Sequence, residues 1–358
     1  MINATSPETA GFDAEDLAEA VTFAQSHESE MDRDIARALE GGHFSEPLPD
    51  GEIIGPTRPR SDPSGMILRH GRIVAQWGPV DAPDMTFSVT KSYLAICAGL
   101  AWDDGLIDLD APAHVVVPEL FDTPQNSTIT WRHLLQQTSE WEGTLWGKAD
   151  RIDRNRSLDS APGIAGLKGT HRDLCAPGTF WEYNDIRVNV LSYALMQVFR
   201  RPLPEVLRER VMRPIGATDK WEWHGYHNST VEIDGRSMQS VSGGAHWGGG
   251  LMIPTTDHAR IGLLMARNGK AGDRQILSRA WIEECLKPCP LNPGYGFLWW
   301  LNRNGETAPS APGSSYFAIG VGRNVIWIDP ELELVCVVRW IEKSDFDGFA
   351  ARVINALR

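Results

Sequence analysis

Segments with the pattern of β-strands lie near both ends of this 358-residue chain, and segments with the pattern of helices fill the middle. Near the first end, two apolar runs flank His70-Gly71, which predicts a β-hairpin. Near the other end, strands are expected at 297–301, 315–319, 324–328 and 334–340. If strands from the two ends pair, they form one antiparallel sheet with the helical block beside it. The predicted class is therefore α+β, an antiparallel sheet flanked by helices with an inserted, mostly helical subdomain.

Helical periodicity and capping residues place the expected helices more closely. Asp13 caps the first, and the others are expected at about 92–102, 131–137, 185–200, 206–212, 255–267, 280–287 and 345–357. We expect one compact unit of two subdomains, with a site at their interface. The sheet subdomain comprises 1–87 and 240–358, and the helical subdomain comprises 88–239.

The composition excludes several classes of protein. With 42% hydrophobic and 23% charged residues, the chain has an ordinary globular composition. The net charge of -13 argues against nucleic acid and anionic membranes as partners, because like charges repel. No apolar run is long enough to span a membrane, and the N-terminal residues lack the pattern of a secretion signal, so we expect a cytoplasmic protein.

The cysteines and histidines indicate neither a disulfide framework nor a metal site. Five cysteines are scattered along the chain, and only Cys285 and Cys289 are close in sequence. No second cysteine or histidine pair accompanies them, as a zinc site requires. Ten histidines occur without an H-E-x-x-H spacing. We therefore expect no metal and no cofactor.

The stretch T-F-S-V-T-K-S-Y-L, residues 86–94, places Ser88 three residues before Lys91 at the start of a buried helical pattern. This spacing puts both side chains on one face of a helix. The helix N-terminus and burial should favour the neutral amine of Lys91, which a general base for Ser88 requires. Alternatively, Ser88 only caps the helix and Lys91 is a solvated lysine.

Tyr183 is a second candidate. It lies in G-T-F-W-E-Y-N-D, residues 178–185, where a turn enters a helix. A tyrosine close to a lysine and to a helix N-terminus can act as a phenolate base. The alternative is a packed aromatic residue, which is the commoner role of tyrosine.

Five segments, in chain order from about 65 to 340, resemble the serine β-lactamase and penicillin-binding-protein superfamily. The resemblance is strongest to its class C-like branch of esterases, D-aminopeptidases and 6-aminohexanoate-dimer hydrolases. The segments are T-F-S-V-T-K-S-Y-L with D-D-G-L-I-D-L-D-A-P, W-R-H-L-L-Q-Q-T-S-E-W, F-W-E-Y-N-D, G-G-G-L-M-I-P-T-T-D-H-A-R-I-G-L-L, and F-A-I-G-V-G-R-N-V-I-W-I-D-P. The resemblance implies the β-lactamase/transpeptidase-like fold.

The resemblance also implies roles for single residues. Ser88 would be the acylated nucleophile, Lys91 its partner base, and Tyr183 the second general acid and base. The backbone N–H groups of Ser88 and Val321 would form the oxyanion hole.

Two departures from the family pattern concern the substrate. Asp185 stands where the family has asparagine, and an aspartate only accepts hydrogen bonds. It also favours a charged Lys91. We therefore expect either a substrate with a donor or cation near Asp185, or an Asp185 that merely caps the following helix. Ala318-Ile319-Gly320 replaces the Lys-Thr-Gly motif, in which Ile319 and Gly320 would border the substrate. The loss of that lysine argues against efficient β-lactam hydrolysis and for a neutral or cationic ester or amide.

Aromatic residues and one histidine could border the same site. Trp141, Trp146 and Trp247 are candidates for an aromatic substrate pocket, and His246 could face it. The alternative for each of them is ordinary packing.

The sequence thus predicts a metal-independent serine hydrolase that cleaves a small-molecule ester or amide through an acyl-enzyme on Ser88. An acyltransferase would use the same residues. A ligand-binding protein without turnover is the alternative from another class, although the retained Ser88, Lys91 and Tyr183 favour an enzyme.

Overall fold

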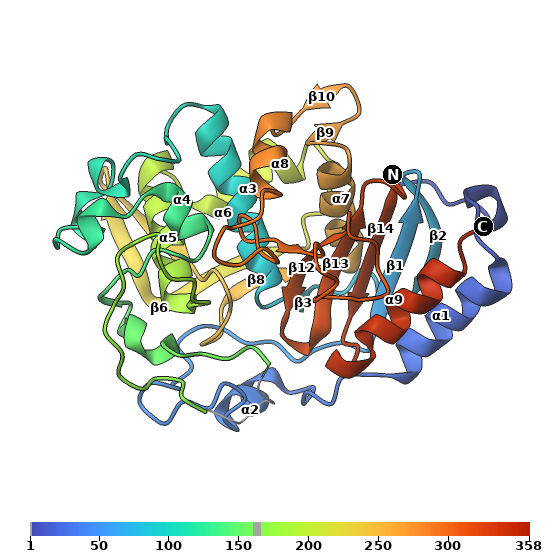
Figure 1. Ribbon diagram of the computed structural model, residues 1–358, viewed down its shortest axis with the longest axis horizontal. Coiled ribbons are helices and arrows are strands. Elements are labelled where there is room, and N and C mark those ends of the chain that lie inside the picture. The colour runs from blue at the N-terminus through green and yellow to red at the C-terminus, as the bar shows by residue number, and fades with distance from the viewer. Residues whose placement is uncertain (1, 160–165) are drawn as a thin grey trace.

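A six-stranded antiparallel sheet joins the two ends of the chain, as Figure 1 shows for this computed structural model, which describes residues 2–159 and 166–358. The strand order is β11-β12-β13-β14-β1-β2. Their bounds are Trp300–Leu301, Tyr316–Gly320, Asn324–Asp329, Leu334–Arg339, Ser64–Arg69 and Arg72–Trp77. β1 pairs with β14, with Ile67 opposite Cys336. The predicted pairing of strands from the two ends is confirmed.

The predicted hairpin at His70-Gly71 is also confirmed. Both turn residues have a positive φ, 51° and 73°. This is the backbone conformation of a tight two-residue turn between antiparallel strands.

Helices cover both faces of this sheet because its strands are apolar on both sides. Met66 and Leu68 point into the larger core, where α7 (Thr255–Ala266) packs. Ile67, between them, points into a second cluster with α1 (Ala14–Ser26) and α9 (Phe346–Asn355). In Figure 1, α1 and α9 lie side by side in front of the sheet.

The remaining helices lie mostly on the other side of the molecule, and the sequence predicted most of them. They are α3 (Val89–Asp103), α4 (Trp131–Leu135), α5 (Asp185–Phe199), α6 (Leu203–Leu207), which continues into a π-helical turn (Arg208–Met212), and α8 (Arg279–Cys285). A short helix that the sequence analysis missed, α2 (Ile35–Glu40), lies at the lower edge in Figure 1. No helix in the described parts of the chain is both long and apolar enough to cross a membrane.

A second sheet, of four strands, was not predicted. Its order is β3-β8-β6-β7, with bounds Asp84–Met85, Gly250–Ile253, Glu222–Ile233 and Arg236–Val241. The long β6–β7 hairpin lies within the segment expected to be mostly helical. The strand expected at 297–301 is correct only at its last two residues.

Candidate active site

Ser88 lies at the start of α3, separated from the end of the strand β3 by two residues. It is the only residue between 84 and 101 that is not buried. Its side chain makes no capping hydrogen bond to the helix, so the alternative that Ser88 merely caps α3 is wrong. The preceding Phe87 is fully buried and has a φ of 47°, a conformation that costs energy for a bulky residue. The tight turn at Phe87 brings an accessible hydroxyl to the end of a buried helix.

Lys91 lies one turn further along α3, with Nζ 2.8 Å from Ser88 Oγ. The side chain is 1% exposed, so the alternative of a solvated lysine is wrong. Burial lowers the pKa of Lys91, but the negative charge of Asp185 and its hydrogen bond to Lys91 outweigh it, and the net effect raises the pKa. The expectation of a neutral Lys91 amine is therefore also wrong, and the resting side chain is an ammonium ion that donates to Ser88.

The Asp185 carboxylate is shared by Lys91, Arg156 and His246. One oxygen, Oδ1, pairs with Lys91. The other, Oδ2, lies 2.6 Å from Arg156 Nη1 and 2.7 Å from His246 Nδ1. Burial raises the pKa of Asp185. The positive charges of Lys91 and Arg156 have the larger, opposite effect, so the pKa lies well below its usual value. The side chain that caps α5 is that of Asn184.

Both expectations for Asp185 therefore fail. Its oxygens are occupied by protein groups and the residue is 2% exposed, so it cannot pair with a substrate cation. It does not cap the helix either. Its role is to hold Lys91.

His246 connects Asp185 to a more distant loop. Its ring is stacked between Phe44 and Trp247, with ring centroids 4.0 and 4.1 Å away. Nε2 lies 2.6 Å from Glu46 Oε1, and Glu46 also pairs with Lys168. His246 is buried, so it reaches the site through Asp185 and not as a surface for substrate.

Asp153 completes the buried network of charges. Its Oδ2 accepts a hydrogen bond from the backbone N–H of Asp185 at 2.7 Å, and its Oδ1 lies 3.1 Å from Lys168 Nζ. Glu46, Asp153 and His246 are close enough together to suggest a metal site. The Lys168 ammonium already pairs with both carboxylates, which makes this group an ion-pair network of the protein itself.

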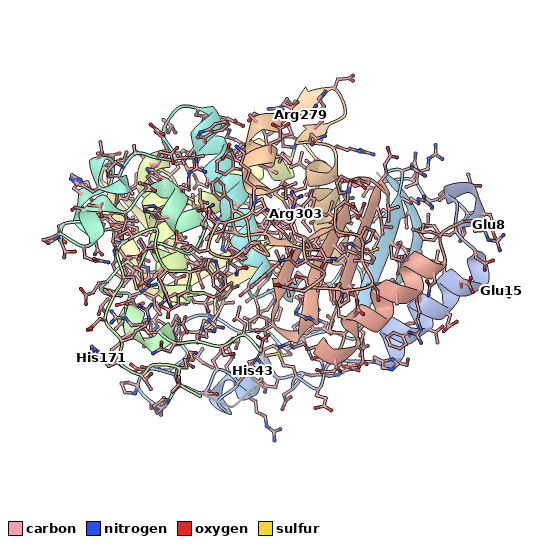
Figure 2. All side chains as sticks on the ribbon, viewed as in Figure 1. Glu8, Glu15, His43, His171, Arg279 and Arg303 are labelled. Atoms are coloured by element: carbon pink, nitrogen blue, oxygen red, sulfur yellow. The ribbon has the colours of Figure 1, made fainter. Side chains whose placement is uncertain are left out.

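His43, which precedes Phe44, lies beside α2 at the lower centre of Figure 2. Burial, together with the charges of His246 and Arg156, lowers the pKa of His43 to about 4. Its ring is therefore neutral near pH 7, and it adds no further positive charge to the network.

Tyr183 packs among aromatic residues and also lies close to Lys91. Its position therefore fits both predictions, a packed aromatic residue and a base beside the lysine. Lys91 Nζ lies 4.7 Å, and Arg156 Cζ 5.4 Å, from the centroid of its ring. The ring stacks on Trp300 at 5.8 Å and meets Tyr295 edge-on at 6.3 Å. A negative charge on the Tyr183 oxygen would lie near two cations.

The end of β12 lies against the Ser88 turn. A Cβ atom added to Gly320 would be 2.2 Å from Thr86 O and 3.2 Å from Ser88 N, so only glycine fits. Within the described ranges, neither the Ser88 N–H nor the Val321 N–H donates to a protein acceptor. Both are therefore free to bind a ligand. Ile319 packs against the cluster beneath α1 and α9.

The predicted tryptophan pocket is not found. Trp141 and Trp247 are buried, and their indole N–H groups donate to the carbonyl oxygens of Leu120 and Asp50. Trp146 meets Tyr193 edge-on at 5.3 Å. The expectation that Trp141 and Trp247 line a pocket is wrong, because both serve as structural residues.

Other residues near Ser88 escaped the sequence analysis. The aromatic residues around Tyr183 are Trp181, Tyr295 and Trp300. The missed charged residues are Glu46, Asp153, Arg156 and Lys168. They come from irregular segments without a motif, and only the fold brings them together.

Comparisons with known proteins agree with this fold. The family model described as Beta-lactamase matches residues 64–340. Similar solved structures include a family VIII carboxylesterase, with a TM-score of 0.59 and 16% identity over 97% of this chain and 98% of that one. EstCE1, described as a hydrolase with promiscuous acyltransferase activity, has a TM-score of 0.59 and 17% identity over 96% and 98%. A penicillin-binding protein from Bacillus halodurans has a TM-score of 0.56 and 17% identity over 82% and 94%. Among curated proteins, none matches the sequence significantly.

Proposed function

Because the chain belongs to the Beta-lactamase family, we propose that it is a metal-independent serine hydrolase that cleaves an ester or amide through an acyl-enzyme on Ser88. The observation that carries this proposal is the contact of 2.8 Å between Lys91 Nζ and the accessible Ser88 Oγ. A hydroxyl held by a buried cation at the start of a helix is set up to become a nucleophile.

In the first step, Ser88 Oγ attacks the carbonyl carbon of the substrate. The carbonyl oxygen becomes an oxyanion, and the free N–H groups of Ser88 and Val321 are its donors. Such donors typically contribute about 2.7–4 kcal/mol each to transition-state stabilisation. The close approach of Gly320 to the Ser88 turn supports this pairing of donors.

The proton of Ser88 requires a base other than Lys91, because Lys91 rests as an ammonium ion. We assign this role to Tyr183 as a phenolate, with Lys91 stabilising the negative charge on Ser88 Oγ. Tyr183 then gives the proton to the leaving group. It takes another from the water that attacks the acyl-enzyme and gives it to Ser88 Oγ as the acyl–oxygen bond breaks, which releases the acid and restores Ser88 and the Tyr183 phenolate.

The substrate class follows from the missing lysine and from the aromatic residues near Tyr183. Ala318, in place of the lysine of a Lys-Thr-Gly motif, is buried and carries no charge. This supports a substrate other than a β-lactam. Trp181 and Trp300 are partly exposed and pack against the buried Tyr295, and they provide an apolar wall on which an ester or amide with an apolar group can pack.

Acyl transfer to an alcohol or amine is a second candidate, which EstCE1 favours through its described acyltransferase activity. The acyl-enzyme and the residues would be the same. Analysis of the products formed with an added alcohol would distinguish ester formation from hydrolysis.

Release of nitrophenol from p-nitrophenyl acetate tests the proposal. We expect steady turnover by the wild type and by Ser344→Ala, which removes an exposed serine remote in sequence. Ser88→Ala should lose at least about 10³-fold in kcat, as expected when a nucleophile is removed. Equal turnover by Ser88→Ala and the wild type would refute the proposal.

A further inference from the structure

A cavity of about 470 Å³ lies apart from the Ser88 site, and none of the residues of that site lines it. It is formed by the N-terminal segment, the β1–β2 turn, the C-terminal end of α7 and β9 (Lys270–Ala271). These elements meet at the upper edge of the molecule in Figure 1. The volume is within the range of sites that hold small molecules.

The charged residues that line this cavity are all basic. They are His70, Arg72, Arg260, Arg267 and Lys270, and no aspartate or glutamate is among the lining residues. The whole chain, in contrast, carries a net charge of -13. The cavity is therefore a basic site on an acidic protein.

Three of these cations have no acidic partner. His70 pairs with Glu333 at 2.5 Å and Arg260 with Asp257 at 3.0 Å. In residues 2–159 and 166–358, no ion pair is formed by Arg72, Arg267 or Lys270. All three residues are exposed, so solvent weakens their mutual repulsion, and a bound anion would compensate it.

The position of Arg267 depends on the turn opposite to it. A Cβ atom added to Gly71 would lie 1.9 Å from Arg267 Nη2, so a larger residue would displace the guanidinium. Gly71 also has the positive φ that the hairpin turn requires. The turn thus allows Arg267 to lie directly against the backbone beside Arg72.

The end of α7 explains only part of this arrangement. Cations are favoured after the C-terminus of a helix, which accounts for Arg267 and Lys270. Arg72 comes from β2, a different element, and it lines the same cavity. Its convergence with the other two is the observation that points to a ligand.

We propose that this cavity binds a small molecule that carries at least two anionic groups, either phosphates or carboxylates. Arg72, Arg267 and Lys270 supply the positive charge. Guanidinium groups suit this role because they bind phosphate and carboxylate oxygens in pairs. The proposal is independent of the reaction at Ser88.

Calorimetric titration of the full chain with pyrophosphate, inorganic phosphate and citrate at low ionic strength tests this site. We expect a one-to-one complex with pyrophosphate or citrate. The double variant Arg267→Gln/Lys270→Gln should bind the preferred probe at least about tenfold more weakly. Arg303→Gln/Lys343→Gln is the charge-matched control, since it removes two exposed cations outside the cavity (Arg303 is labelled in Figure 2).

Tighter binding of pyrophosphate would identify the ligand as a phosphate compound, and tighter binding of citrate would identify it as a carboxylate. Circular dichroism establishes that the variants are folded, and Arg72→Gln, on another element, replaces the double variant if that one does not fold. Hydrolysis at Ser88 should be unchanged in all of them. Absence of binding to the wild type, or an equal loss in the control variant, would overturn the proposal.

Discussion

At the scale of single residues, Asp185 decides the chemistry of the site. An asparagine at this position would leave Lys91 buried without a negative partner. The carboxylate instead makes Lys91 a permanent cation, and it joins Lys91 to Arg156 and His246. In the proposed mechanism, this departure from the family pattern changes the role of the lysine and leaves the base function to Tyr183.

Asp185→Asn should lower the free energy of unfolding at neutral pH by about 3–5 kcal/mol, because Lys91 and Arg156 lose a buried negative partner. Folding lowers the pKa of this carboxyl, so the group stabilises the fold fully at pH values above its pKa in the unfolded chain, about 3.9. This stabilisation is lost as the pH falls towards the pKa of the folded state. The difference between variant and wild type should therefore shrink as the pH is lowered to about 3. Urea denaturation at the two pH values measures both effects.

Asp219→Asn is the matched control, because Asp219 is exposed and forms no ion pair among the described residues. It should change the free energy of unfolding by less than about 0.5 kcal/mol. If Asp185→Asn were as stable as this control at neutral pH, the carboxylate would not be holding the cations.

His246→Phe tests the connection from Glu46 to the site. The phenyl ring keeps the stack between Phe44 and Trp247, but both hydrogen bonds to carboxylates are lost. We expect kcat to fall about 10- to 100-fold through misplacement of Asp185 and Lys91, with KM nearly unchanged. Steady-state kinetics with p-nitrophenyl acetate would show this, and a change in KM alone would contradict it.

The sequence could predict some of these residues and not others. Ser88 and Lys91 are three positions apart on one helix, so their contact follows from helix geometry. Helix position and burial predicted a neutral Lys91, whereas Asp185 predicted a charged one, and only the fold shows that Asp185 pairs with Lys91 directly. Glu46, Arg156 and Lys168 follow no periodic pattern, and only the folded chain brings them to the site.

At the scale of elements, the end of β12 and the start of α3 form the candidate oxyanion hole. Gly320→Ala should lower kcat by about 10²–10³-fold, because the added methyl group overlaps Thr86 O and separates the two N–H donors. Gly313→Ala is the matched control, since its nearest atom would be Asn302 O at 4.0 Å. Folded Gly320→Ala protein with full activity would exclude this pairing of donors.

Helices and strands were predicted where the sequence has a clear helical or alternating pattern of apolar residues. The β6–β7 hairpin lacks such a pattern and was missed. Its turn, Asp234-Gly235, has positive φ values of 52° and 73° and is a typical hairpin sequence. The flanking strands contain charged and polar residues and little apolar alternation, so the turn was the only strong signal. The Asp-Gly turn at 234–235 could have indicated this hairpin, although it gives no sign of β3 and β8, which complete the second sheet.

At the scale of the whole molecule, the predicted α+β class and the β-lactamase/transpeptidase-like fold are confirmed by the sheet and by the family match. Because the predicted strands lie near the two ends of the chain and helices fill the middle, the strands can pair in only a few ways. This explains why the fold could be predicted. The boundary at 240 between the subdomains stays a prediction, since the second sheet pairs strands from both sides of it.

The distribution of thiols over the molecule gives a prediction independent of the site. Of the five cysteines, only Cys175 is partly exposed. Burial raises the pKa of Cys97 to about 12 and that of Cys285 and Cys336 well above the usual value. Native protein should therefore react with one equivalent of Ellman's reagent, and denatured protein with five. Rapid reaction of several thiols in the native state would contradict this packing.

The central claim is that Ser88 forms the acyl-enzyme, and a covalent phosphonate probe tests it most directly. Intact-protein mass spectrometry, followed by peptide mapping, should show one adduct on the wild type, located on Ser88. The Ser88→Ala variant should show none. If the wild type remained unlabelled, or if the adduct persisted in Ser88→Ala, the chain would be a binding protein with this fold or an enzyme that uses another nucleophile.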